Sequence, residues 1–344
     1  MSCAFITGLV GPVLAAQEQA FLRDAAPFGL ILFKRNIEAP DQVRRLVAEA
    51  REAVGSQVPV LVDQEGGRVQ RLGPPHWPAY PPGAAYGEVY DRDAETGLRA
   101  ARLGARLIAA DLHALGIDVD CLPVADVPAA DADRIIGDRA YGETPQKVSA
   151  LAAAAAQGLL DGGVLPVVKH LPGHGRATAD SHHALPVVAT GRDILESSDF
   201  AAFRPLKGLP LGMTAHVVFT AIDPSAPATT SPIMIGQVIR ETIGFAGVLM
   251  SDDISMGALT GTITERTRAA VAAGCDLVLH CNGHFDEMLE VAENAPTLRG
   301  ASARRAADAL AARHTPNALD QAAARAEFAS LMARRGAGAP AGLS

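Results

Sequence analysis

The residues best suited to chemistry lie in one segment, residues 168–186, with the sequence VKHLPGHGRATADSHHALP. It holds four histidines, one lysine and one aspartate among glycines and prolines. The apolar run before it, residues 164–168, predicts a short buried strand, so these polar residues follow the carboxyl end of a strand. Sheets and barrels of the α/β class place their catalytic side chains at this end of their strands. The segment is therefore a candidate site for acid and base catalysis.

A second predicted strand ends in two adjacent carboxylates. Residues 247–253 read GVLMSDD, an apolar run that leads into Asp252 and Asp253. A carboxylate beside a His/Asp cluster can act as a base or as a nucleophile. An acid pair also favours the first turn of a helix, where it interacts with the helix dipole. We expect Asp253 to have such a structural role and Asp252 to be the reactive acid.

The spacing of the apolar runs predicts eight strands that alternate with helices. The runs are residues 4–10, 29–33, 58–62, 117–122, 164–168, 210–214, 247–250 and 276–280. Helix signals fall between them: Thr144-Pro145 supplies an N-cap and an N1 proline, and Ser231-Pro232 begins a helix that Gly244 ends. This alternation favours an α/β fold of the (β/α)8 TIM-barrel type over a doubly wound sheet.

The chain contains no linker that would divide it into separate domains. Leucines at helical spacing predict a helix over residues 92–115, and the Ala/Arg-rich segment 296–335 predicts terminal helices that pack outside the barrel. We therefore predict one catalytic domain, residues 1–335, which consists of the barrel and extra C-terminal helices. Residues 336–344 are expected to form a frayed tail.

Polar residues far apart in the sequence should meet at one mouth of this barrel. The reason is that the carboxyl ends of all parallel strands point the same way. In strand order the set is Asp63 and Arg71 after the third strand, Arg139 after the fourth, residues 169–182 after the fifth, His216 after the sixth and Asp252 after the seventh.

The composition limits the possible partners and compartments. The chain has 344 residues and a net charge of −8, with a pI near 5.7. Nucleic acids and anionic membranes bind clustered cations, so we expect neither as a partner. The cysteines (Cys3, Cys121, Cys275 and Cys281) lack the spacing of a zinc site or a disulfide framework and indicate reduced thiols in a cytoplasm. The N-terminal segment has no basic start typical of a signal peptide, and its apolar run is too short to span a membrane.

Four ordered segments resemble those of a known enzyme family. They are LVDQEGGRVQR (residues 61–71), IIGDRAYG (135–142), KHLPGHG with DSH (169–182) and LMSDD (249–253). In these segments the sequence is similar to the single-domain bacterial β-N-acetylglucosaminidases of glycoside hydrolase family 3, enzymes of peptidoglycan recycling. The resemblance covers most of the chain. It departs from the family at Leu171, where an aromatic residue is usual, and at the additional His183.

The resemblance implies a role for each of eight residues. Asp252 would be the nucleophile that forms a covalent glycosyl-enzyme, His182 the general acid and base, and Asp180 its orienting partner. The other residues would bind N-acetylglucosamine in the −1 subsite: Asp63, Arg71, Arg139, Lys169 and His170. The implied substrate is N-acetylglucosamine linked to 1,6-anhydro-N-acetylmuramic acid, with or without peptide, and the implied location is the cytoplasm. We expect a monomer that uses no metal ion or organic cofactor.

The chemistry of histidine fits the role of general acid and base that the resemblance implies for His182. Most retaining glycosidases use two carboxylates, but imidazole, with an ordinary pKa near 6.5, can both donate and accept a proton at neutral pH. An ionised Asp180 on the other ring nitrogen of His182 would favour the imidazolium and fix its tautomer.

Each assignment also has a structural alternative. Asp180 and His182 could form an Asx-type turn with a solvated imidazole. For the binding residues the alternatives are a surface cation (Lys169), a cap on the turn before EGG (Asp63), and ion pairs with acids on neighbouring loops (Arg71 and Arg139).

Two other classes of protein remain open at this point. A metal-dependent barrel hydrolase could use the N and O ligands of one loop: His170, His174, Asp180, His182 and His183. Against it, the first strand lacks an HxH motif, and the ligands would all come from a single segment. A sugar-binding module without catalysis would need aromatic stacking platforms, but aromatic residues make up only 4% of the chain and Trp77 is its one tryptophan.

Overall fold

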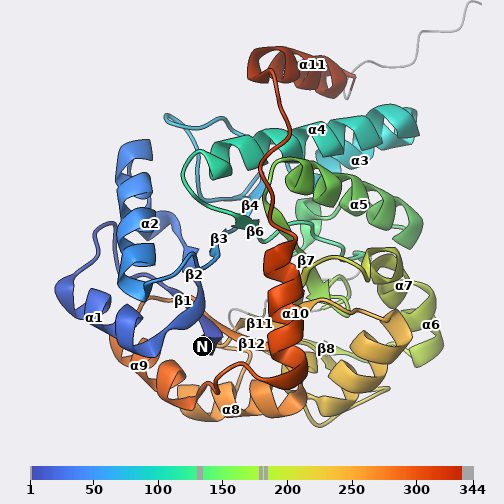
Figure 1. The fold of residues 1–344 in the computed structure, drawn as a ribbon. Helices are drawn as coiled ribbons and strands as arrows, with labels where there is room; N and C mark the ends of the chain where they lie inside the picture. The colour runs from blue at the N-terminus through green and yellow to red at the C-terminus, as the bar shows by residue number, and fades with distance from the viewer. Residues whose placement is uncertain (1, 130–134, 178–180, 182–184, 335–344) are drawn as a thin grey trace, which may run out of the picture.

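The chain folds as a closed barrel of eight parallel strands (Figure 1). The computed structural model describes residues 2–129, 135–177, 181 and 185–334. Around the barrel the strands are β1 (Cys3–Gly8), β12 (Leu277–His280), β11 (Val248–Asp253), β9 (Leu211–Thr214), β7 (Leu165–Leu171), β6 (Val119–Asp120), β3 (Val60–Val62) and β2 (Pro27–Leu32). Each predicted apolar run coincides with one of these strands, because an interior strand covered by helices is apolar on both faces. The predicted (β/α)8 TIM-type barrel is confirmed.

Two strands, β7 and β11, extend at their carboxyl ends past the apolar runs that predicted them. The run 164–168 predicted a strand that ends before the polar segment, but β7 continues through Leu171. Lys169 and His170 are therefore strand residues, not loop residues. Leu171 pairs with Thr214 of β9, so backbone pairing with the neighbouring strand, and not side-chain polarity, decides where β7 ends.

The helices follow the predicted boundary signals. α5 (Pro145–Asp161) begins where the Thr144 hydroxyl accepts the amide hydrogen of Lys147. The helix predicted over residues 92–115 is α4 (Ala94–His113), and it begins later because the Asp93 carboxylate caps it. Asp93 also follows the last residue of α3 (Gly83–Arg92), a helix that the apolar pattern did not predict.

The helix predicted between Ser231-Pro232 and Gly244 is also present. It is η5 (Met234–Ile243), which has π-type hydrogen bonding, and Gly244 ends it with a left-handed φ of 81°. Before the two C-terminal helices, the other helical elements of the described residues are α1 (Ala16–Ala25), η1 (Lys34–Asn36), α2 (Pro40–Val54), η2 (Gly137–Arg139), α6 (Arg192–Ser197), α7 (Asp199–Phe203), η3 (Arg204–Leu206), η4 (Ala228–Thr230), α8 (Ile263–Ala273) and α9 (Phe285–Asn294).

Two pairs of short strands in the described residues lie outside the barrel sheet. β4 (Gln64–Gly66) and β5 (Val69–Gln70) form an antiparallel hairpin directly after β3, and β8 (Val187–Val188) pairs with β10 (Val218–Phe219). The hairpin turn needs glycine, because Gly66 has a φ of 97° and a Cβ on it would lie 2.3 Å from the Pro81 carbonyl oxygen. The EGG sequence therefore encodes the turn that carries the polar residues around it.

The terminal helices pack on the outside of the barrel, as predicted. α10 (Gly300–Ala311) lies across the end opposite the polar strand ends and buries Ala306 and Ala309 against the barrel interior (Figure 1). Asp276, just before β12, accepts hydrogen bonds from Ser302 and Arg305 of α10. α11 (Gln321–Ala333) packs on α3 and α4. The predicted tail, residues 336–344, lies outside the described residues.

Among the described residues, the structure has no helix with the length and apolar character needed to cross a lipid bilayer.

Candidate active site

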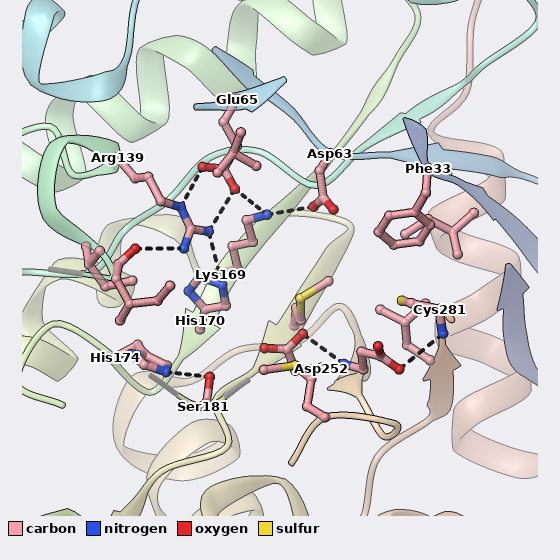
Figure 2. Close-up of a pocket in the computed structure, with 18 of the residues that line it drawn as sticks. Phe33, Asp63, Glu65, Arg139, Lys169, His170, His174, Ser181, Asp252 and Cys281 are labelled. Carbon is pink, nitrogen blue, oxygen red and sulfur yellow. Dashed lines mark hydrogen bonds and ion pairs between the residues drawn. The ribbon is translucent and has the colours of Figure 1, made fainter. Parts of the chain in front are cut away.

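A cavity of about 270 Å³ opens at the carboxyl ends of the strands. Six of the eight residues singled out in the sequence line it: Asp63, Arg71, Arg139, Lys169, His170 and Asp252. They come from loops and strands that are far apart in the chain, and closure of the barrel brings them together (Figure 2). The predicted convergence of strand ends is thus observed for the described residues.

A network of ion pairs forms one side of this cavity. The ammonium of Lys169 lies 2.9 Å from Asp63 Oδ1 and 2.6 Å from Glu65 Oε1 (Figure 2). Arg139, at the end of η2, binds both oxygens of Glu65 at 2.8 Å. Arg71 binds Asp63 Oδ2 at 2.8 Å, and its guanidinium stacks on the ring of Phe33.

The structural alternatives for these residues can now be compared with the contacts. Lys169 is not a surface cation, because only 3% of its side chain is exposed. Arg71 and Arg139 do pair with acids from nearby loops, as the alternative anticipated, but the pairs lie within the cavity wall. Asp63 bonds to cations instead of capping the EGG turn.

The network is held in its ionised form. Burial by itself raises the pKa of Glu65, but the charges of Arg139 and Lys169 outweigh it and lower the pKa to about 2. The pKa of Asp63 is likewise well below its ordinary value, since Lys169 and Arg71 overcome the effect of burial. Burial lowers the pKa of Lys169, but the two carboxylates more than offset it and the net shift is upward. The cavity therefore offers permanent donors and acceptors of the kind that bind sugar hydroxyls.

Asp252 supplies a separate carboxylate in the cavity. It belongs to β11, which pairs through Asp253 with β12 and so extends past the apolar run into the mouth. Burial raises the pKa of Asp252, but the nearby rings of His216 and His170, the Asp253 amide hydrogen and Lys169 outweigh it, and the net pKa lies below the ordinary value. Asp252 is thus a partly buried, ionised carboxylate that lines a cavity, which is the state a nucleophile requires.

Asp253 has a structural role, but not the expected one in the first turn of a helix, because the next helix, α8, begins only at Ile263. Its Oδ1 accepts amide hydrogens from Ser255 at 3.0 Å and from Cys281 at 3.1 Å, and its Oδ2 accepts the Ser255 hydroxyl at 2.7 Å. These bonds join the loop after β11 to the end of β12. The two adjacent acids therefore differ in their contacts, which the SDD motif does not reveal.

His216 holds the strand end that carries Asp252. The ring is fully buried; Nε2 lies 2.9 Å from the Asp253 carbonyl oxygen, and Nδ1 lies 2.7 Å from Thr229 Oγ1. Thr229 in turn bonds to Thr214, whose hydroxyl accepts the Asp252 amide hydrogen. The sequence placed His216 after the sixth strand but assigned it no role.

The proposed acid/base pair, Asp180 and His182, and the additional His183 lie outside the described residues. The residue between the pair, Ser181, is described and lines the cavity. Its hydroxyl lies 3.1 Å from Nε2 of His174, and its carbonyl oxygen accepts the Ala258 amide hydrogen at 3.1 Å. The alternative, in which Asp180 and His182 form a turn with a solvated imidazole, concerns the same residues and is therefore not tested by the structure.

The sequence missed two carboxylates of the site. Glu65 lies within the segment LVDQEGGRVQR, but no local signal shows that it binds both Lys169 and Arg139. Asp126 is fully buried and lies 2.6 Å from Nδ1 of His170. A usable signal existed for Asp126, since it is an acid that closely follows the fourth predicted strand.

The alternative of a metal centre depended on five ligands from one loop. Within residues 2–129, 135–177, 181 and 185–334, no group of three or more His, Cys, Asp or Glu side chains is arranged to hold a metal ion. His170 is bonded to Asp126 and His174 to Ser181. The other three ligands of this alternative, Asp180, His182 and His183, lie outside the described residues.

His174 should make the stability of the protein depend on pH. Burial, reinforced by His170, lowers the pKa of His174 from 6.5 to about 4. The unfolded chain binds this proton more readily, so the free energy of unfolding should fall by up to about 3 kcal/mol as the pH falls from about 6.5 to about 4. Urea denaturation at a series of pH values measures this. The variant His174→Gln should show a shallower slope in this range, whereas replacement of the exposed His113 by Gln should leave it unchanged. Equal slopes in all three proteins would contradict the assignment.

The barrel and its mouth define a class of protein. A barrel glycosidase needs a carboxylate and fixed polar groups in a cavity at the carboxyl ends of its strands, and the described residues supply both. Residues 8–310 match the model of the glycosyl hydrolase family 3 N-terminal domain, and the chain belongs to this family.

Its relatives make the class more specific. The chain is 42% identical over 281 residues to a beta-hexosaminidase from Alkalilimnicola ehrlichii, with 80% of this chain and 79% of the relative covered. The crystal structure of native NagZ from Neisseria gonorrhoeae has a TM-score of 0.83 and 34% identity, over 97% of this chain and 96% of that one. The same protein in complex with N-trifluoroacetyl-D-glucosamine gives a TM-score of 0.83 at 33% identity, with 96% of each chain covered. The chain is therefore a glycoside hydrolase of the β-N-acetylhexosaminidase type.

Proposed function

We propose that the enzyme is an exo-β-N-acetylglucosaminidase that removes N-acetylglucosamine from 1,6-anhydro-N-acetylmuramic acid, with or without an attached peptide, in peptidoglycan recycling. The observation that carries the proposal is the ionised Asp252 in a small cavity whose other wall is a network of ion pairs around the buried Lys169 and Glu65. The related NagZ from Neisseria gonorrhoeae binds N-trifluoroacetyl-D-glucosamine, a close analogue of the sugar proposed here. The four sequence segments that resemble the recycling enzymes support the choice of leaving group.

In the proposed mechanism the sugar is transferred twice. Asp252 attacks the anomeric carbon of the sugar. The bond between this carbon and the leaving-group oxygen breaks, and His182 gives that oxygen a proton. The covalent glycosyl-enzyme is then attacked by water, from which His182 removes a proton, and Asp252 departs as a carboxylate. These steps need a nucleophile, one proton carrier and water, so the proposal includes no metal ion or organic cofactor.

The remaining predicted residues are proposed to bind the sugar in the −1 subsite. Asp63 and Lys169 offer an acceptor and a donor fixed by their own ion pair, and Arg71, Arg139 and His170 extend this polar surface along the cavity. Because these groups are positioned before the sugar arrives, little ordering is required when it binds. A cavity of about 270 Å³ suits one terminal sugar, which supports exo action.

The proposed location is the cytoplasm, and the proposed active form is a monomer of one catalytic domain, residues 1–335. The four cysteines are free thiols, and three of them are buried. Free thiols suit a reducing compartment, which supports the cytoplasm.

The proposed function can be tested by the identity and stereochemistry of the first product. With an aryl N-acetyl-β-glucosaminide, proton NMR should show β-N-acetylglucosamine first, followed by slow appearance of the α anomer, because two inversions retain configuration. Initial release of the α anomer would overturn double displacement. The disaccharide with 1,6-anhydro-N-acetylmuramic acid should be cleaved with a higher kcat/KM than di-N-acetylchitobiose, and the opposite order would overturn the proposed substrate. The same assay in phosphate buffer, followed by phosphorus NMR, shows whether phosphate replaces water as the acceptor.

A further inference from the structure

Asp126 is a buried carboxylate that the proposed mechanism does not use. It lies after β6, in the loop that precedes the cavity residues 135–139, and it is fully buried. Burial raises the pKa of Asp126, but the neighbouring His170 ring and the hydrogen bonds from His170 and His174 outweigh it, and the net pKa is below the ordinary value. A buried carboxylate that remains ionised must be held by donors, and here all the donors come from β7 and the segment directly after it.

The contacts of Asp126 form a compact set. Oδ2 lies 2.6 Å from Nδ1 of the His170 ring. Oδ1 accepts the His174 amide hydrogen at 2.7 Å and the His170 amide hydrogen at 3.3 Å. One carboxylate thus fixes the ring of His170, the backbone at the end of β7 and the start of the GHG turn.

These contacts determine which nitrogen of His170 carries the proton. A carboxylate can only accept, so the short contact requires a hydrogen on Nδ1. The other ring nitrogen, Nε2, lies 3.5 Å from Nη2 of Arg139, a group that can only donate (Figure 2). Nε2 must therefore present its lone pair, and His170 offers an acceptor to the cavity.

We propose that Asp126 is a positioning residue that holds His170 in the Nδ1–H tautomer, so that Nε2 accepts a hydrogen bond from a hydroxyl group of the bound sugar. The cavity is lined on this side by Lys169 and Arg139, which are donors. An acceptor among them lets a sugar hydroxyl bind as donor and acceptor at once. In hydrolytic triads and metal sites, too, a carboxylate binds the histidine nitrogen that faces away from the ligand, and this contact fixes the tautomer and the orientation of the ring. The inference rests on the proposed sugar-binding role of His170.

The tautomer can be observed in the wild-type enzyme without any substitution. In protein labelled with ¹⁵N-histidine, NMR should show a protonated Nδ1 and an unprotonated Nε2 for His170, identified by the signals that disappear in His170→Gln. Asp126→Asn should change these signals, because an amide can donate to Nδ1 as well as accept from it. A protonated Nε2 in the wild-type enzyme would overturn the proposal, whatever activity the enzyme has.

A double-mutant cycle tests whether Asp126 acts through His170. Asp126→Asn should lower kcat/KM for the aryl N-acetyl-β-glucosaminide about 10- to 100-fold, but only about 3-fold or less in a His170→Gln background. Equal losses in both backgrounds would show that Asp126 only supports the backbone, and would overturn the proposal. If no aryl glycoside is hydrolysed by the wild-type enzyme, the proposed function fails, while the NMR result still decides the tautomer.

Asp223→Asn is the matched control. Asp223 is also buried and accepts loop hydrogen bonds, from Ser225 and Ser231, but it does not line the cavity. This control should lower the melting temperature without changing kcat/KM or the His170 signals. If it reproduces the effects of Asp126→Asn, those effects report general loosening of the fold, and the positioning role is rejected.

Discussion

Replacing Asp252 with asparagine should lower kcat for an aryl N-acetyl-β-glucosaminide by more than about 10³-fold, because the covalent step loses its nucleophile. The fold should be retained. Asparagine has nearly the same shape, and the Asp252 main chain is held by Thr214 and, through Asp253, by His216. The measurement is steady-state kinetics with a melting curve on the same protein.

Asp253→Asn is the control for this experiment, since it changes the adjacent acid in the same way. Asp253 accepts two amide hydrogens and one hydroxyl. Its replacement should cost about 1–3 kcal/mol of unfolding free energy and much less activity than the loss at Asp252. A 5-fluoro glycosyl inactivator should label a peptide at Asp252, as seen by mass spectrometry. Labelling at Asp253 would reverse the roles proposed for the two acids.

Replacing His182 with alanine should separate substrates by the basicity of their leaving group. A sugar alkoxide must be protonated as it departs, whereas a nitrophenolate leaves without a proton. The first chemical step should therefore slow by about 10²- to 10⁴-fold for the natural disaccharide and much less for a nitrophenyl glycoside. Kinetics with both substrates, compared with the wild-type enzyme, measures the difference.

The second step supplies an independent check on His182. Without a base to deprotonate water, hydrolysis of the glycosyl-enzyme should limit the rate for the aryl substrate, so KM should fall together with kcat. Azide needs no deprotonation and should restore turnover with formation of the β-glycosyl azide. Equal losses for both substrates and no azide product would make His182 a binding or structural residue. The acid/base would then have to be sought among His170, His174 and His183.

The sequence predicted the barrel because the information needed for it is local. An interior strand such as β12 (Leu277–His280) is a short apolar run, and helix ends such as Thr144 and Gly244 are marked by capping residues. The strand ends then indicated which polar residues belong to the mouth. Six of the eight proposed site residues line the cavity, Asp180 and His182 lie outside the described residues, and the roles of all eight remain predictions.

The sequence could not predict the partners of these residues. Lys169 pairs with Asp63, which is 106 residues away in the chain, and Asp126 bonds to a histidine 44 residues away. Such distances are set by closure of the barrel and by the exact path of loops after different strands, and no local pattern encodes them. The same holds for the two acids of the SDD motif. Both acids line the cavity, but only the tertiary structure brings Ser255 and Cys281 to the Asp253 carboxylate. These contacts support the proposal that Asp253 is structural and that Asp252 is the acid that reacts.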